Sequence, residues 1–138
     1  MRALDPIRRS ENMRRIRSKD TKPEKALRSL LHRAGYRFRI HRNNLPGSPD
    51  IVFPARRKVI FVHGCFWHQH SQCGAGIVPG SRREYWVPKL ERNQDRDHRA
   101  KLDLARLGWK SLTVWECEIE KNPAAALRRS TVFLDTKA

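Results

Sequence analysis

Long apolar runs are missing from this sequence. No stretch approaches the ~18 consecutive apolar residues that a transmembrane helix needs, and the basic N-terminus has no apolar segment like that of a signal peptide. These absences argue against a membrane or secreted protein, so we expect a cytosolic one. Internal repeats and low-complexity segments are also missing, and 138 residues suit one domain with one core.

Cysteine is scarce as well. Three cysteines, an odd number, do not suit a disulfide framework, and in a reducing compartment they fit metal ligation better. Cys65, His70 and Cys73 are close in sequence, and Cys117 lies much further along the chain. Together they could form a Cys3His tetrahedron for structural zinc, although the spacing is not that of a common zinc finger. Three separately buried thiols are the alternative.

Acidic residues are few. The chain has 14 Asp and Glu against 30 Lys and Arg, which gives a formal net charge of +16 at pH 7. The simplest partner for such an excess is a polyanion, because neutralising phosphates releases condensed counterions. Nucleic acid is the partner that charge predicts, although a basic ribosomal protein or a merely well-solvated one has a similar composition.

The most informative stretch runs from residue 59 to residue 70. Residues 59–62 form an apolar run rich in β-branched and aromatic types, which predicts a strand covered on both faces. Three imidazoles, a thiol and two adjacent aromatic rings follow at once: His63, Cys65, Phe66, Trp67, His68 and His70. A core alone does not need these groups, which bind metals, move protons or stack on bases. We therefore expect a functional site where this strand ends.

Two carboxylates upstream each have a structural and a functional interpretation. Thr21 and Glu24 form a capping box that opens a predicted helix over residues 21–34, and Gly35 ends it. Glu24 can therefore close a helix N-terminus without any catalytic role. Alternation over residues 36–40 predicts a half-exposed strand, and the turn-rich loop 43–49 leads to Asp50 at the start of strand 51–53. Asp50 is either a turn residue or a hard-cation ligand.

The flanking segments complete the predicted order of elements. Residues 1–20 are a basic arm that orders on phosphates or else a solvated tail, and residues 21–138 form the folded domain. Residues 81–84 are a second capping box, before a helix from about Pro88 to Leu107 and a strand over residues 110–115. One stripe of that helix, expected to face inward, carries Asn93, Asp97, Ala100, Leu104 and Leu107. A short C-terminal helix opens at Asn122-Pro123.

This α-β-β-β-α-β order, with Glu24 in the first helix and Pro49-Asp50 at the second strand, resembles the PD-(D/E)XK restriction-enzyme-like nucleases. Phe61 and His63 stand where that superfamily has a carboxylate and a lysine. More specifically, residues 10–117 resemble the very-short-patch-repair (Vsr) DNA mismatch endonucleases. The residues that carry the resemblance are Asn12-Met13, Asp20-Thr21 with Glu24, Leu45-Pro46-Gly47-Ser48-Pro49-Asp50, Phe61-Val62-His63-Gly64-Cys65-Phe66-Trp67-His68, Glu84-Tyr85-Trp86, Asn93 with Arg96-Asp97, and Gly108-Trp109 leading to Val114-Trp115-Glu116-Cys117.

The resemblance implies a fold, two kinds of metal and a set of site residues. The fold is a three-layer α/β restriction-endonuclease-like one, with a central mixed β-sheet flanked by helices. Asp50 and the backbone carbonyl of Val62, where familiar members have Thr, would hold one or two Mg²⁺. His63 and His68 would orient water or move protons, with Glu24 in the outer shell of the metal's waters. The implied zinc ligands are Cys65, His70, Cys73 and Cys117, with one residue more between His70 and Cys73 than in familiar members.

The resemblance also implies how DNA is recognised. Phe66, Trp67 and Trp86 would wedge between base pairs, which costs less at a poorly stacked T·G mismatch. Further implied DNA contacts come from Met13, Arg14, Lys89, Asn93 and Asp97. For Trp86 the alternative is helix packing, and for Asn93 and Asp97 it is a buried hydrogen-bond network.

The implied function is a Mg²⁺-dependent, zinc-containing endonuclease that nicks duplex DNA 5′ to the thymine of a T·G pair, where 5-methylcytosine has deaminated. It would act as a monomer in the bacterial cytoplasm, near the nucleoid, with mismatch-repair proteins such as MutL as partners. One alternative is a related Mg²⁺-dependent endonuclease for another DNA structure or sequence. The other is a catalytically silent DNA-binding module.

Overall fold

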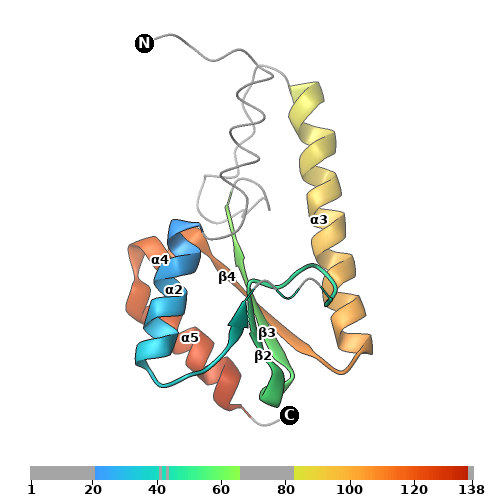
Figure 1. Ribbon diagram of the computed structural model, residues 1–138. Coiled ribbons are helices and arrows are strands. Elements are labelled where there is room, and N and C mark those ends of the chain that lie inside the picture. The colour runs from blue at the N-terminus through green and yellow to red at the C-terminus, as the bar shows by residue number, and fades with distance from the viewer. Residues whose placement is uncertain (1–20, 41, 43, 66–82, 137–138) are drawn as a thin grey trace.

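The computed structural model describes residues 21–40, 42, 44–65 and 83–136. The expectations for the arm at residues 1–20 and for Phe66, Trp67, His68, His70 and Cys73 lie outside these ranges. In chain order the described elements are α2 (Lys22–Arg33), β1 (Arg39–Ile40), β2 (Ile51–Phe53), a short 3-10 turn (Pro54–Arg56), β3 (Lys58–His63), α3 (Arg83–Arg106), β4 (Lys110–Trp115), α4 (Glu116–Lys121) and α5 (Pro123–Asp135) (Figure 1). None of these helices is long and apolar enough to cross a membrane.

The four strands form one mixed sheet in the order β1-β2-β3-β4. β2 pairs antiparallel with β1 and with β3, whereas β3 and β4 run parallel and pair from Lys58↔Lys110 to His63↔Trp115. The parallel pair needs a crossover, and α3 lies on that connection. β3 is the central strand that residues 59–62 predicted, and β4 has the predicted bounds.

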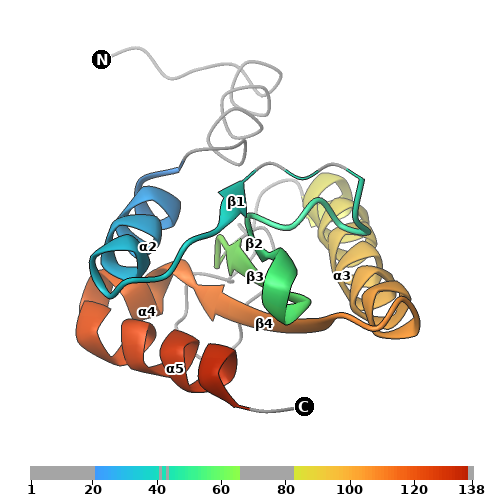
Figure 2. The ribbon, with the colours of Figure 1, turned by 60° about the horizontal axis from the view of Figure 1, so that its bottom comes forward.

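Helices cover both faces of the sheet (Figure 2). On one face α2, α4 and α5 enclose a core with Leu27, Ile60, Val114 and Leu134 among its members. On the other face α3 brings Leu104 against residues such as Val59. The alternation of the β3 side chains between these two cores explains why its apolar run is continuous. Within the described residues, the predicted α/β class, mixed sheet and element order are confirmed.

The strand predicted over residues 36–40 is wrong in extent. β1 has only two residues, and both are exposed. Arg39 and Ile40 pair with Val52 and Ile51, and the pairing stops there although β2 continues to Phe53. Tyr36 and Phe38 instead pack against the Phe53 ring at centroid distances of 6.5 and 5.9 Å. The alternation of apolar residues at Tyr36 and Phe38 therefore reflects packing against the core. These two residues do not pair in the β-sheet.

The long helix and the C-terminal segment also differ from prediction. α3 begins at Arg83 instead of about Pro88, so Pro88 lies inside the helix, where its missing N–H interrupts the backbone ladder. The helix ends at Arg106, which leaves Leu107 54 % exposed and makes its assignment to the buried stripe wrong. α4 was not predicted, because six residues are too few to show a helical period.

A buried lysine joins the start of β3 to the end of α5. The Lys58 ammonium donates to the carbonyl oxygens of Phe133, Leu134 and Thr136 at 2.6, 3.2 and 2.5 Å. These acceptors lie at the negative end of the helix dipole. Burial lowers the pKa of Lys58 from its ordinary value, and its charged neighbours Lys110 and Arg56 lower it further.

Lys58→Met is expected to reduce the free energy of unfolding by about 1–3 kcal/mol, because the carbonyls at the end of α5 lose their donor. Urea unfolding followed by circular dichroism measures the difference. Lys110→Met, at the exposed position opposite Lys58 in the sheet, is the matched control and should change stability by less than ~0.5 kcal/mol. Equal stability of the two variants would contradict this role for Lys58.

Candidate active site

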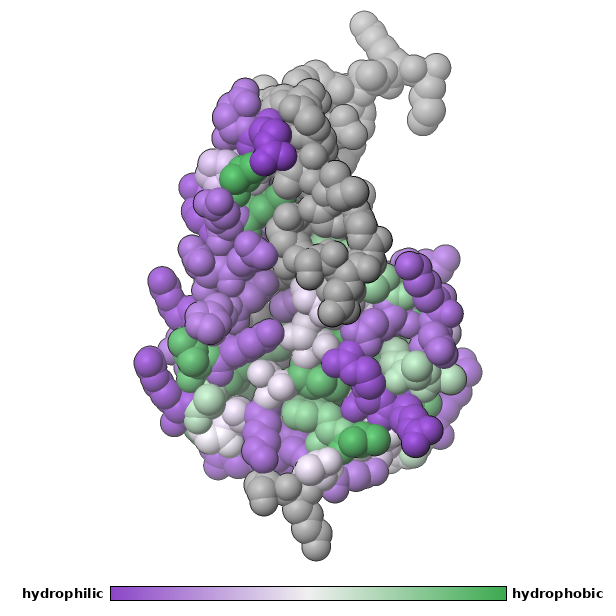
Figure 3. Space-filling model, turned by 180° about the vertical axis from the view of Figure 1, so that it is seen from behind, coloured by the Kyte–Doolittle hydropathy of each residue, from purple (hydrophilic) through white to green (hydrophobic). Residues whose placement is uncertain are grey.

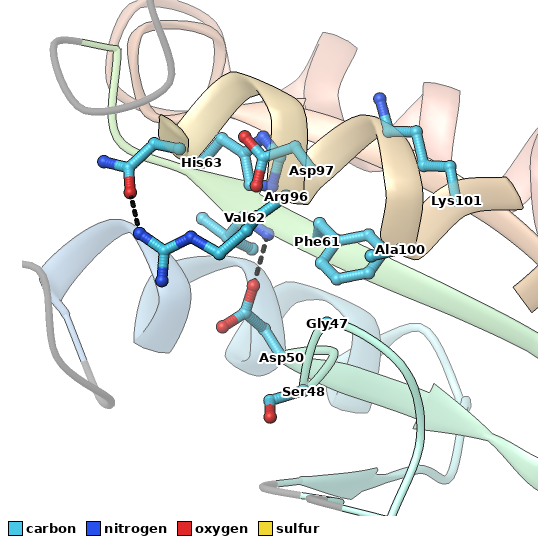
Figure 4. Close-up of a pocket in the computed structure, with 11 residues that line it drawn as sticks. Gly47, Ser48, Asp50, Phe61, Val62, His63, Arg96, Asp97, Ala100 and Lys101 are labelled. Carbon is cyan, nitrogen blue, oxygen red and sulfur yellow. Dashed lines mark hydrogen bonds between the residues drawn. The ribbon is translucent and has the colours of Figure 1, made fainter. Parts of the chain in front are cut away.

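A pocket of about 400 Å³ opens where β3 ends, between the start of β2 and the middle of α3 (Figure 4). The loop before β2, the end of β3 and one face of α3 each contribute to its wall. The lining residues are Gly47, Ser48, Asp50, Phe61, Val62, His63, Asn93, Arg96, Asp97, Ala100 and Lys101. Asp50 and His63, two residues predicted to act together, therefore line the same pocket. His68, the third, lies outside the described residues.

A tight turn sets the position of the loop that carries Asp50. The Ser48 N–H donates to the Leu45 carbonyl at 3.1 Å, and Pro46 and Gly47 are the central residues of this turn. Gly47 has φ 77°, and a Cβ there would lie 2.6 Å from the Ala100 Cβ. Only glycine fits this approach, so the predicted turn loop packs directly against α3.

The Asp50 carboxylate reaches across to β3. One of its oxygens accepts the Val62 N–H at 2.7 Å, so the carboxylate bonds to the neighbouring strand. Burial raises the pKa of Asp50 to about 7. The Val62 hydrogen bond opposes this rise, the charge of Glu24 adds to it, and Arg28 lowers it. A cation near this carboxylate would favour its charged form.

Glu24 combines a structural contact with a position near Asp50. Its side chain accepts the Thr21 N–H at 3.3 Å while the Thr21 hydroxyl accepts the Glu24 N–H at 3.4 Å, which confirms the capping box. The other carboxylate oxygen lies 3.9 Å from the Arg28 guanidinium. Glu24 is only 2 % exposed, and its charge acts on Asp50. The first turn of α2 thus brings a second carboxylate toward the pocket.

His63 is the last residue of β3 and is only 5 % exposed. Its ring lies between the rings of Phe61 and Trp115, at centroid distances of 5.6 and 5.4 Å. These rings restrict the imidazole, which still reaches the pocket wall. A fixed imidazole beside a carboxylate can orient water or exchange a proton with a bound group.

α3 supplies polar residues to the opposite wall. Asn93 is buried, Asp97 is partly exposed, and both line the pocket as their place on the inward stripe predicted. The Asn93 side-chain oxygen accepts a hydrogen bond from the Arg96 guanidinium. Figure 4 shows the Arg96 side chain extending from α3 across the pocket. This part-buried bond is compatible with the hydrogen-bond network offered as the alternative for Asn93, and both interpretations stay predictions.

Sequence reasoning missed several pocket residues. Arg96 was recognised only as part of a motif shared with the family, and no role was predicted for Ser48 or Lys101. Arg96 follows Asn93 by three residues on a helix, and this spacing was the available signal. Nothing in the sequence pairs the loop at Ser48 with Lys101, because that proximity depends on how the loop packs on α3.

Two of the four predicted zinc ligands belong to the described residues. Cys65 is buried, Cys117 is partly exposed, and neither forms a disulfide. Each lies two residues beyond the paired residues His63 and Trp115, and the Cys65 N–H donates to the Glu116 carboxylate at 2.9 Å. The two thiol-bearing segments are thus adjacent. Within the described ranges, no group of three or more His, Cys, Asp and Glu side chains forms a metal site, and the predicted set includes His70 and Cys73 outside them.

Trp86 lies in the first turns of α3 and is 6 % exposed. Its ring meets the Tyr85 ring edge-on at 5.0 Å, and the Lys89 ammonium lies 5.8 Å from its centroid. In the protein without DNA, the Trp86 ring is thus buried and packed against its neighbours. Its predicted wedge role and the predicted DNA contact of Lys89 remain predictions.

The known proteins that this chain resembles are named as DNA mismatch endonucleases or type II nicking enzymes. Residues 1–74, more than half of the chain, match the family described as DNA mismatch endonuclease Vsr. A protein named type II nicking enzyme V.XorIIP, from Xanthomonas oryzae pv. oryzae, is 59 % identical over 130 residues, covering 94 % of this chain and 95 % of the relative. The DNA mismatch endonuclease Vsr of Escherichia coli is 48 % identical over 115 residues, covering 83 % and 73 %. The type II nicking enzyme V.NmeAIP of Neisseria meningitidis is 41 % identical, covering 88 % and 86 %. The chain therefore belongs to the Vsr DNA mismatch endonuclease family and is a DNA nicking endonuclease.

Proposed function

We propose that this nicking endonuclease cuts one strand of duplex DNA 5′ to the thymine of a T·G mismatch, in the repair of deaminated 5-methylcytosine. The observation that carries the proposal is the shared pocket of Asp50 and His63, which faces an α3 wall with Asn93 and Asp97. The Escherichia coli relative, named a DNA mismatch endonuclease, supports the choice of a mismatch as the target. The three layers and the mixed sheet support a restriction-endonuclease-like core.

The donor atoms of the pocket fit a hard cation, for which we propose one or two Mg²⁺. Asp50 offers a buried carboxylate, and the charge of Glu24 adds a second negative group nearby. The N–H and C=O of one residue leave an extended strand on the same side, so the Val62 carbonyl faces the same side of β3 as the N–H that binds Asp50. Oxygen ligands of this kind suit Mg²⁺, which when bound supplies positive charge at the phosphate and makes water more acidic.

Hydrolysis then needs proton transfer and positioning from the side chains. A bond forms between a water oxygen and phosphorus, the bond from phosphorus to the leaving oxygen breaks, and that oxygen gains a proton. His63 is proposed to orient the water and accept its proton, and His68 to serve the leaving oxygen. Glu24 is proposed to order water around the metal, and Arg96 to lie close to the reacting phosphate.

Recognition is proposed to combine wedging with polar contacts. Phe66, Trp67 and Trp86 would separate the mismatch from a neighbouring pair, where poor stacking lowers the cost. Further contacts to DNA are proposed for Met13, Arg14, Lys89, Asn93 and Asp97. We also propose that the protein acts as a monomer beside the bacterial nucleoid, with mismatch-repair proteins such as MutL as partners.

A structural Zn²⁺ held by Cys65, His70, Cys73 and Cys117 is part of the proposal. The adjacency of the segments that bear Cys65 and Cys117 supports it, because thiolates from two distant segments can close one tetrahedral site. Metal analysis of purified protein is expected to find about one Zn per chain. Cys117→Ser should lower both the zinc content and the melting temperature. Folded, zinc-free wild-type protein would refute the site.

The test of the proposed target compares three labelled duplexes of equal length in Mg²⁺: fully matched, T·G and branched. Selective nicking of the T·G duplex, mapped to the bond 5′ to the thymine, is expected. Equal cutting of all three would remove mismatch specificity. Selective cutting of a matched recognition sequence or of the branch would favour an endonuclease with another target, and binding without cutting would favour a silent module.

A further inference from the structure

The outer flank of α3 carries a row of arginines that includes the pocket residue Arg96 and three that the site does not use. Arg92, Arg96, Arg99 and Arg106, called here the arginine row, are all exposed. At 100° per residue they fall within about 80° of one another around the helix, beside the stripe that lines the pocket. Figure 3 shows that hydrophilic side chains follow the α3 edge of the molecule, on the left in that view.

Surface grooves link the pocket to this row. Arg96 lines both the pocket and a second hollow formed with Arg92, Asp95 and Arg99. Asp95 and Arg99 also line a third hollow, which extends to Arg106. The three hollows share lining residues in succession, so they lie next to one another along α3, from the pocket toward its C-terminal end; they are called here the track.

The acidic side chains along the track do not pair with all of its arginines. Asp95 and Asp103 lie within one helical turn of Arg92, Arg99 and Arg106. Among the described residues, Arg106 is the one member of the row with an ion pair, to Asp103 at 3.3 Å, and this exposed contact contributes little. In the part of the chain that the structure describes, Arg92 and Arg99 form no ion pair or hydrogen bond. A face whose charges were satisfied by internal pairs would engage these two guanidinium groups.

We infer that the arginine row binds the phosphate backbone of the substrate DNA on one side of the nick. Arg96 stands at the pocket, and Arg106 lies about 15 Å further along the helix axis, which is the length of roughly four nucleotide steps of one strand. The guanidinium groups offer forked donors suited to phosphate oxygens. The inference rests on the proposal that the pocket holds the phosphate to be cut.

The test measures how salt weakens binding. The row variant carries Arg92→Gln, Arg99→Gln and Arg106→Gln. A matched control carries Arg33→Gln, Lys121→Gln and Arg128→Gln, which removes the same charge from exposed positions in the α2, α4 and α5 layer. Binding to a fluorescent 20-base-pair duplex with a central T·G pair is measured without Mg²⁺ and without chelator from about 0.05 to 0.3 M NaCl, where each lost phosphate contact lowers the log–log slope by ~0.9.

The row variant is expected to lose about 2–3 in that slope and to bind roughly 10–10²-fold more weakly at ~0.1 M salt, since its three phosphate contacts are gone. The control should keep a slope closer to that of the wild type. Two further duplexes, each shortened on one side of the mismatch, locate the contact. On the duplex that lacks the DNA expected to lie along α3, the row variant and the wild type should bind alike. Identical slopes for row variant and control, or a loss independent of which flank is removed, would overturn the inference.

The same change in slope is expected on a matched duplex, because the contacts are to phosphates. If the protein proved to cut another target, the proposed function would be wrong, but the difference in salt dependence between the row variant and the control would still be expected. Conversely, row and control variants with equal slopes would contradict the inference while T·G nicking persisted.

Discussion

Asp50→Ala is expected to nick T·G duplex at least ~10²-fold more slowly than wild type while still binding it, because the variant loses the charge that holds the metal at the phosphate. Single-turnover nicking in Mg²⁺ and duplex binding without Mg²⁺ are the two measurements. Asp103→Asn, in the exposed ion pair on α3, is the control and should nick at close to the wild-type rate. Unimpaired cutting by the Asp50 variant would contradict the assignment.

Asp50→Asn separates a ligand from a structural group. The amide oxygen can still accept the Val62 N–H, so the local hydrogen bond survives. The carboxyl has a pKa of about 7 in the folded chain and 3.8 as its ordinary value, so the folded state binds the proton more tightly between these values. Stability of the Mg²⁺-free protein therefore falls as pH rises from about 4 to about 7. Without Mg²⁺ at pH 8 the Asn variant should be more stable than wild type by about 1–4 kcal/mol, and with Mg²⁺ it should nick poorly.

Replacing His63 should have a similarly large effect. His63→Ala is expected to slow nicking by ~10²–10⁴-fold, the usual contribution of a positioned acid or base. Because the ring occupies a buried place between Phe61 and Trp115, its removal leaves a space at the pocket wall. Added imidazole should therefore restore part of the activity, which would not happen if the ring served only in packing.

Two controls complete the His63 experiment. His63→Phe keeps an aromatic ring in the same place without a proton-transfer group, and it should be folded but equally slow. His32→Ala, at an exposed histidine on α2, should leave the rate unchanged. Wild-type rates in His63→Phe would remove proton transfer from the role of this residue.

The sequence predicted correctly the elements that depend on interactions between residues close together in the chain. The capping box of Thr21 and Glu24 and the apolar run of β3 depend on neighbours in sequence, and both are present. The end of β3 also gave the position of His63 at the pocket. The short β1 and the exposure of Leu107 were not predictable in this way, because they depend on the packing of Tyr36 and Phe38 against Phe53 and on where α3 ends.

The pocket itself is a product of tertiary packing. Gly47 meets Ala100 across the sheet face, and Asp50 bonds to Val62 on another strand. Arg96 crosses from a helix that follows much later in the chain. No spacing rule encodes these distances, so the sequence indicated Asp50 and His63 by residue type and resemblance but gave no role to Arg96, which lines the same pocket.

The central claim is that the Asp50 carboxylate and the Val62 carbonyl hold a divalent cation at the phosphate to be cut. Its most direct test is a crystal structure of the chain with a T·G duplex and Mn²⁺, with anomalous scattering used to locate the metal. We predict a peak about 2.1 Å from both oxygens and next to the phosphate 5′ to the thymine. Anomalous peaks elsewhere only, in crystals whose DNA becomes nicked, would contradict the account.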